Sequence, residues 1–89
     1  QMLDIQPEID YHLALIEAWC DQYVNLSMAS HARRWVARIV RKCQLQGADV
    51  AAAIAERLPL LDETSFGAVV DLARGIATEI CGGPVDGGV

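Results

Sequence analysis

Apolar residues recur with the spacing of α-helices over four stretches of this 89-residue chain. Residues 1–6 predict an irregular lead-in, and the glycine-rich residues 82–89 predict a flexible tail. The sequence therefore predicts an all-α fold, a small bundle of four helices in a single domain over residues 7–81. The expected helices run from about Pro7 to Val24, through the stretch His31–Leu45 to near Gly47, from Asp49 to Pro59, and from Glu63 to Cys81.

Polar residues between the first two helices indicate where the second helix begins. Asn25, Ser27 and Ser30 could each accept a hydrogen bond from a free N–H group at a helix start. We expect two helices joined by a tight turn, which gives an antiparallel hairpin. One continuous helix is the alternative, because Asn and Ser oppose helix formation only weakly.

Capping residues also place the third and fourth helices. Asp49 is the expected N-cap of the third helix, and either Asp62 or Thr64 is expected to cap the fourth. Gly67 and Gly75 lie on one line of the fourth helix, where each costs about 1 kcal/mol relative to alanine. They indicate either that another backbone comes close or that the helix simply tolerates glycine there.

The first helix has an apolar surface that is too wide for a single contact. Its first stripe consists of Ile9, Leu13, Ile16, Cys20 and Val24. A second stripe beside it consists of Tyr11, Leu15 and Trp19. With their neighbours, the two stripes cover roughly 220° of the helix, against roughly 100° for an ordinary surface helix. One stripe can face the core, so the other needs a second cover, either the fourth helix or a second subunit.

The second helix is strongly amphipathic and carries most of the basic side chains. At about 100° per residue, one half of it is apolar. The other half carries five of the seven basic residues of the chain, Arg33, Arg34, Arg38, Arg41 and Lys42. Solvation is the usual state of such a face. Alternatively, an acidic surface in the chain, in a second copy or on another molecule binds it, since like charges at this spacing repel one another.

The composition narrows the choice of partners. A net charge of −5 argues against non-specific binding of nucleic acid, which depends on a basic surface. The hydrophobic fraction of 53% is high for a domain of 89 residues, so we expect a homodimer or another protein partner to cover apolar surface. No apolar run approaches the roughly 18 residues that cross a bilayer. The N-terminus lacks the order of a signal peptide, and we expect a cytoplasmic protein with no membrane contact.

The sequence contains no pattern that predicts catalysis, a metal site or a cofactor site. Cys20, Cys43 and Cys81 lie on apolar helix faces without the spacing of zinc ligands, so we expect buried free thiols. His12 and Cys20 are about 12 Å apart along one helix, too far for a nucleophile pair. His31 lies in the opening turn of the second helix, where the helix dipole disfavours its cation. We therefore expect a protein that is not an enzyme.

Two familiar patterns fail in their details. Ser65 precedes an apolar helix, as in acyl carrier proteins, but the Asp-Ser-Leu attachment motif of that family reads Thr-Ser-Phe here. The second and third helices have the turn length of a helix-turn-helix, yet the expected recognition helix offers only Glu56 and Arg57 as long polar side chains. DNA binding would instead have to use the basic helix, laid along phosphates.

A protein–protein interaction module explains these features best. The most concrete version is an anti-activator or adaptor that sequesters a transcription factor or a similar partner. Tyr11, Leu15 and Trp19 would form a dimer or partner interface, and the five basic side chains would steer the chain toward an acidic patch. The alternatives are a nucleic-acid-associated protein that uses the basic helix 31–45, and an accessory subunit of a larger complex.

Overall fold

The computed structural model describes residues 5–83, which form an all-helical fold. Over these residues there is no β-strand, and the prediction of four helices is confirmed. Residues 1–4 of the expected lead-in and residues 84–89 of the expected tail lie outside the described part, whereas Gln6 already belongs to the first helix. The elements are α1 (Gln6–Tyr23), α2 (Leu26–Lys42), the short 3-10 helix η1 (Gln44–Gln46), α3 (Gly47–Arg57), a second 3-10 helix η2 (Leu58–Leu60) and α4 (Phe66–Cys81).

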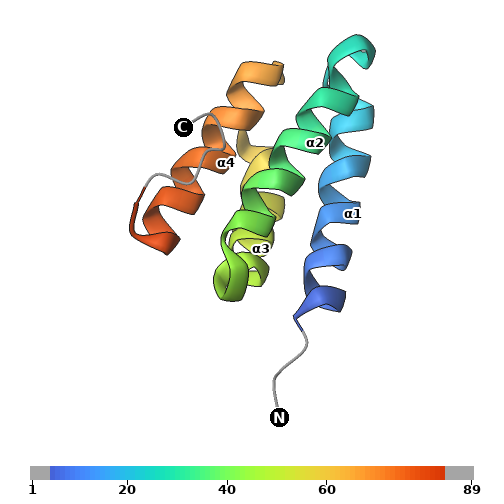
Figure 1. Ribbon diagram of the computed structural model, residues 1–89. Coiled ribbons are helices and arrows are strands. Elements are labelled where there is room, and N and C mark those ends of the chain that lie inside the picture. The colour runs from blue at the N-terminus through green and yellow to red at the C-terminus, as the bar shows by residue number, and fades with distance from the viewer. Residues whose placement is uncertain (1–4, 84–89) are drawn as a thin grey trace.

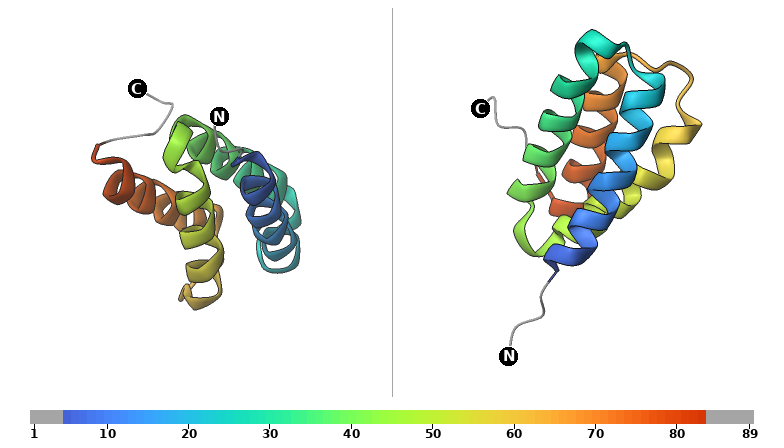
Figure 2. Two further views of the ribbon diagram at one scale, coloured as in Figure 1. Left: turned by 90° about the horizontal axis from the view of Figure 1, so that it is seen from below. Right: turned by 90° about the vertical axis from the view of Figure 1, so that its right-hand side faces the viewer.

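The four helices surround one core, with α1 and α4 on opposite flanks. In Figure 1, α2 lies between α1 and α4, and α3 crosses behind them. The left view of Figure 2, seen from below, also places α1 and α4 on opposite sides of the molecule. Both α1 and α4 pack against α2 and against α3. One surface of α2 therefore stays open between its two neighbours.

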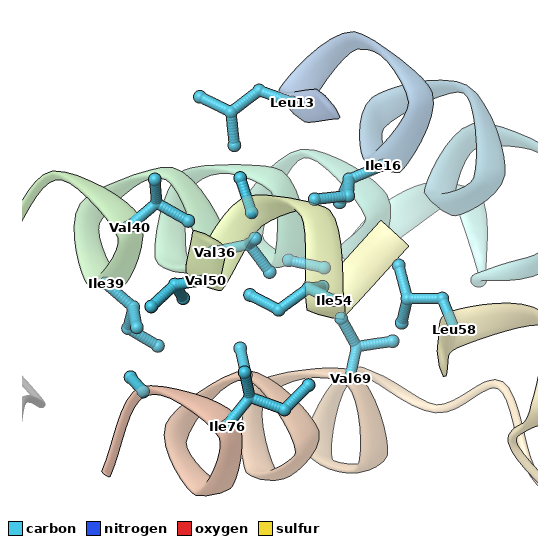
Figure 3. Packing of buried hydrophobic residues seen from close by; sticks show 14 of the residues in the cluster. Leu13, Ile16, Val36, Ile39, Val40, Val50, Ile54, Leu58, Val69 and Ile76 are labelled. Atoms are coloured by element: carbon cyan, nitrogen blue, oxygen red, sulfur yellow. The ribbon is translucent and has the colours of Figure 1, made fainter. Parts of the chain in front are cut away.

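Branched aliphatic side chains from all four helices fill the core (Figure 3). Burying one such side chain stabilises a fold by about 1.5–3 kcal/mol. The first stripe of α1 is buried along its whole length, as predicted. The largest completely buried side chains are Ile16 from α1, Val36, Ile39 and Val40 from α2, Val50 and Ile54 from α3, Leu58 from η2 and Val69 from α4.

The connection between α1 and α2 is a tight turn, so the predicted hairpin is confirmed and the single continuous helix was wrong. The N–H of Val24 donates to the carbonyl oxygen of Cys20 at 2.9 Å and closes α1. Asn25 is the N-cap of α2, and its Oδ1 accepts from the Ser27 N–H at 3.0 Å. The Ser27 hydroxyl donates to the same oxygen at 2.9 Å. Of the three candidate caps, the structure uses the first.

The join between α2 and α3 differs from the prediction. Helix α2 ends at Lys42 rather than near Gly47, and Gln44 adopts a left-handed conformation with φ of +50° before η1. Gly47 begins α3 instead of ending α2. Asp49 therefore lies in the first turn of α3 and is not its N-cap. A carboxylate in that turn still favours the helix through the dipole.

Gly47 is required at this join because of a close approach and not because of its backbone angles. Its φ of −57° suits any residue. A Cβ atom there would lie 3.0 Å from the carbonyl oxygen of Val40 and 3.1 Å from Cδ1 of Ile9. The start of α3 consequently packs directly on the end of α2.

Helix α4 begins three residues later than expected, and its predicted caps were wrong. Ser65, rather than Asp62 or Thr64, is the N-cap. Its Oγ accepts from the Ala68 N–H at 3.1 Å and donates to Oε1 of Glu63 at 2.6 Å. The chain stays irregular after η2 as far as Ser65, which delays the helix.

The other glycines of α4 have different roles. Gly82 ends the helix with a φ of +79°, the left-handed conformation that glycine adopts at low cost. A Cβ atom at Gly67 or Gly75 would meet nothing within 4 Å. Within the described chain, these two positions are therefore tolerated glycines rather than points of close approach.

Candidate functional site

The open surface of α2 brings most of the predicted site residues together. The apolar half of this helix points into the core, where Ala29, Ala32, Val36, Ile39 and Val40 are buried. Burial of that half fixes the rotation of the helix, so the basic half faces outward. Arg34, Arg38, Arg41 and Lys42 are exposed, and Arg33 is half-buried on the side toward α1. These five side chains and Arg74 are called the basic face below.

One edge of the basic face is neutralised by an ion pair with α1. Nη1 of Arg33 donates to Oδ2 of Asp21 on α1 at 3.2 Å. A hollow of about 360 Å³ beside this pair is lined by Glu17 together with Arg33, Arg34 and Arg41. No carboxylate of residues 5–83 lies within ion-pair distance of the four exposed basic side chains of α2. Their charge is therefore directed at solvent or at a partner.

Arg74 on α4 extends the basic face, and sequence reasoning missed it. Its Cζ lies 5.4 Å from the centre of the Trp35 ring, and Cζ of Arg38 lies 5.3 Å from the same centre. Trp35 is half-buried at the border between α2 and α4. Six of the seven basic residues of the chain thus lie on or beside the exposed side of α2. The sequence offered one indication of this position, because Arg74 lies at the edge of the apolar face of the fourth helix.

The second stripe of α1 remains uncovered. Tyr11 and Leu15 are 62% and 47% exposed, and Trp19 is half-buried. The fourth helix was one expected cover for this stripe, and that alternative was wrong because α4 lies on the far flank of the molecule (Figure 2). The Trp19 and Tyr23 rings contact each other, with their centres 5.2 Å apart.

An apolar hollow continues this stripe toward η2. It has a volume of about 540 Å³. Its lining consists mainly of apolar and aromatic side chains, among them Leu15, Trp19, Tyr23, Pro59 and Leu61. Leu60, which follows Pro59, is 78% exposed. The apolar stripe and the basic face therefore occupy two adjacent sides of the α1–α2 hairpin.

The histidines are not brought into a catalytic arrangement by the fold. Nδ1 of His12 lies 2.9 Å from the carbonyl oxygen of Glu8, a contact within one turn of α1. His31 is exposed beside Arg34 and Arg38, and it lies in the second turn of α2 rather than in the expected opening turn. Residues 5–83 contain no group of three His, Cys, Asp or Glu side chains placed to hold a metal ion. None of the described helices is both long enough and apolar enough to cross a membrane.

The cysteines are free thiols, as predicted, but two of them are neighbours. Cys20 and Cys43 are buried as expected, whereas Cys81, which was also expected to be buried, is only half-buried. Burial raises the pKa of the Cys20 thiol to about 11, with a smaller contribution from the charge of Asp21. Burial raises the pKa of the Cys43 thiol to about 12, and a hydrogen bond with Cys81 makes the second-largest contribution. Raised pKa values keep both buried thiols protonated and unreactive at neutral pH.

Comparison of this chain with protein-family models, curated proteins and solved structures finds no match.

Proposed function

We propose that this chain is a small regulatory module that binds another protein. In its most concrete form it is an anti-activator or adaptor that covers the interaction surface of a transcription factor or a similar partner. The observation that carries the proposal is the segregation of charge: six of seven basic residues gather around α2 in a protein of net charge −5. An acidic surface on the partner complements this face.

The apolar stripe of α1 supplies the second half of the binding surface. Charged rims raise association rates and select partners, whereas buried aromatic and aliphatic anchors slow dissociation. Tyr11 and Leu15 are exposed anchors, and Trp19 lies at the edge of the apolar hollow. A partner that lies across the α1–α2 hairpin would contact both surfaces at once.

Self-association through the same stripe is part of the proposal. An isologous dimer in which α1 packs on α1 of the second copy would cover Tyr11 and Leu15, so the partner would have to replace the second copy on this stripe. Sedimentation at several concentrations tests this directly. We expect a dimer at micromolar concentration that Leu15→Asp converts to a folded monomer. A wild-type monomer that persists well above micromolar concentration would contradict the dimer.

Quantitative affinity capture from native lysate tests the partner proposal. The wild type is compared with Arg38→Glu plus Arg41→Glu on the basic face, with Leu15→Asp on the stripe, and with Arg57→Glu as the matched control. Arg57 is a surface cation on α3, away from the basic face, whose Nη1 donates to the carbonyl oxygen of Ala53. We expect one protein to be retained by wild type and control and lost by both site variants. Equal retention by all four chains would refute the proposal.

Nucleic-acid association is the rival function, and one observation favours it. The four exposed cations of α2 form no ion pair with a carboxylate of the described residues, so they are available to bind phosphate. Titration with duplex DNA discriminates between the two functions. We expect no binding at micromolar concentration in physiological salt. Micromolar binding with a steep salt dependence that Arg38→Glu plus Arg41→Glu abolishes would favour the rival.

A further inference from the structure

Trp35 holds two guanidinium groups from different helices in defined positions. Arg38 comes from α2 and Arg74 from α4, and both lie within 5.4 Å of the centre of the Trp35 ring. Contact with an aromatic ring restricts a guanidinium group while its edge remains able to donate hydrogen bonds. Because the fold already restricts these side chains, they lose less conformational entropy when they bind an anion.

A small hollow lies beside this cluster. It has a volume of about 180 Å³ and is lined by His31, Arg34, Trp35 and Arg38. At about 30 Å³ per water molecule, this space holds on the order of six waters, which is room for one tetrahedral oxyanion with a few waters around it. The hollow has no carboxylate in its lining, unlike the neighbouring hollow that includes Glu17.

We propose that this hollow is a phosphate subsite, which binds the phosphomonoester group of a phosphorylated side chain in the partner protein. The inference rests on the proposed function and adds the chemistry of the partner. A guanidinium group binds phosphate through two parallel hydrogen bonds, and Arg34 and Arg38 lie one turn apart on the same side of α2. A phosphomonoester carries about −1.5 to −2 charges near neutral pH, which matches two arginines better than one carboxylate does.

The surroundings favour a phosphorylated protein over a nucleic-acid backbone. A strand that continued from the hollow across α2 toward α1 would meet the carboxylates of Glu17 and Asp21 at that edge. Repeated phosphates would be repelled there, whereas a single phosphate can occupy the hollow without reaching them. The net charge of −5 adds a general repulsion against a polyanion.

Titration of the isotope-labelled protein, followed by the two tryptophan indole N–H signals in NMR spectra, reads out the site. The probes are phosphoserine and an acidic peptide with one central phosphoserine, together with the same peptide unphosphorylated and a short duplex DNA. We expect the phosphopeptide to move the Trp35 signal and to leave the Trp19 signal in place. It should also bind at least tenfold more tightly than the unphosphorylated peptide. An unmoved Trp35 signal, or equal affinities of the two peptides, would overturn the inference.

Substitutions separate the subsite from general attraction between opposite charges. Arg34→Gln and Arg38→Gln should each weaken phosphopeptide binding by about tenfold or more, because each removes charge-assisted hydrogen bonds. Arg57→Gln removes the same charge outside the basic face and should leave affinity within about twofold. A loss as large in Arg57→Gln as in the two site variants would overturn the inference. Tighter binding of the duplex DNA than of the phosphopeptide would favour the nucleic-acid alternative instead.

Phosphatase treatment of the captured partner distinguishes failure of this inference from failure of the proposed function. If dephosphorylation abolishes capture, as basic-face substitutions do, both proposals are supported. If capture depends on the basic face but survives dephosphorylation, the phosphate subsite is wrong and the protein-binding function stands. If no capture depends on the basic face, the proposed function fails, and the peptide titration still decides whether the hollow binds phosphate.

Discussion

Alanine at Gly47 and at Gly75 should change stability in opposite directions, although both glycines lie in α-helices. At Gly75, in the middle of α4, the new methyl group would meet nothing within 4 Å. Alanine there reduces the freedom of the unfolded chain and favours the helix, which should stabilise the protein by about 0.5–1 kcal/mol. This is the default effect against which Gly47 is compared.

At Gly47 the same methyl group would press on α2. It would lie 3.0 Å from the carbonyl oxygen of Val40, a backbone atom that cannot move without moving the helix. The other near atom, Cδ1 of Ile9 at 3.1 Å, ends a side chain and can shift. Overpacking of this kind costs about 1–3 kcal/mol. The propensity gain is small at the first residue of a helix, so we expect a net loss of about 1–2 kcal/mol.

Urea unfolding followed by far-ultraviolet circular dichroism measures these differences. The free energy of unfolding of small proteins falls by about 1–3 kcal/mol per molar urea, so 1 kcal/mol shifts the unfolding midpoint by about 0.3–1 M and both effects are measurable. Gly67→Ala is the matched control, because Gly67 lies in the first turn of α4 but has open space around it. It should be neutral or slightly stabilising. A stabilising Gly47→Ala would refute the close packing of α3 on α2.

Two further predictions concern the cap of α4 and the thiols. Ser65→Ala should destabilise the protein by about 0.5–2 kcal/mol, while Thr64→Ala should change its stability by less than about 0.5 kcal/mol. Urea unfolding measures both, and a larger loss for Thr64→Ala would indicate that Thr64 is the N-cap. Because the pKa values of Cys20 and Cys43 are raised to about 11 and about 12, iodoacetamide near pH 8 should alkylate Cys81 first. Mass spectrometry of the digested protein checks this, and early modification of Cys20 would contradict its burial. The unfolded chain releases these two thiol protons from about pH 8.5, before the folded chain does, so their contribution to stability should fall as pH rises above that value.

Spacing along the chain was enough to predict most of the residues that α1 and α2 bury. The apolar stripe of α1 from Ile9 to Val24 is buried as expected, and so is most of the apolar half of α2. Met28 and Trp35 were expected on that half as well, but Met28 is exposed and Trp35 is half-buried. Side-chain positions within one helix follow from its period alone, so no knowledge of its neighbours was needed. The basic character of the exposed half of α2 follows for the same reason.

Helix ends were predicted less well, since several residues compete for the same role. Asp62, Thr64 and Ser65 are all acceptable N-caps, and the irregular path of the chain after η2 selects Ser65. Glycine is the residue type that commonly ends a helix, but Gly47 begins α3, and its close contact with Val40 explains why glycine is needed there. Such choices depend on packing between helices, which the local sequence does not contain.

Contacts between helices could not be predicted from the sequence at all. Trp35 and Arg74 are 39 positions apart in the numbering, and Cys43 and Cys81 are 38 apart. Both pairs meet because α4 packs beside α2. A helical pattern gives the faces of each helix but not the partner of each face. The place of Arg74, the sixth cation of the basic face, could therefore be known only from the fold.

The central claim is that the basic face binds an acidic protein surface, and equilibrium binding of the purified partner to three chains tests it most directly. These are the wild type, Arg38→Glu plus Arg41→Glu, and the control Arg57→Glu. Reversal of charges that contact a partner costs about 2 kcal/mol or more, so the double variant should bind about 30-fold more weakly or worse. The control should match the wild type. Equal affinity of all three chains would contradict the claim.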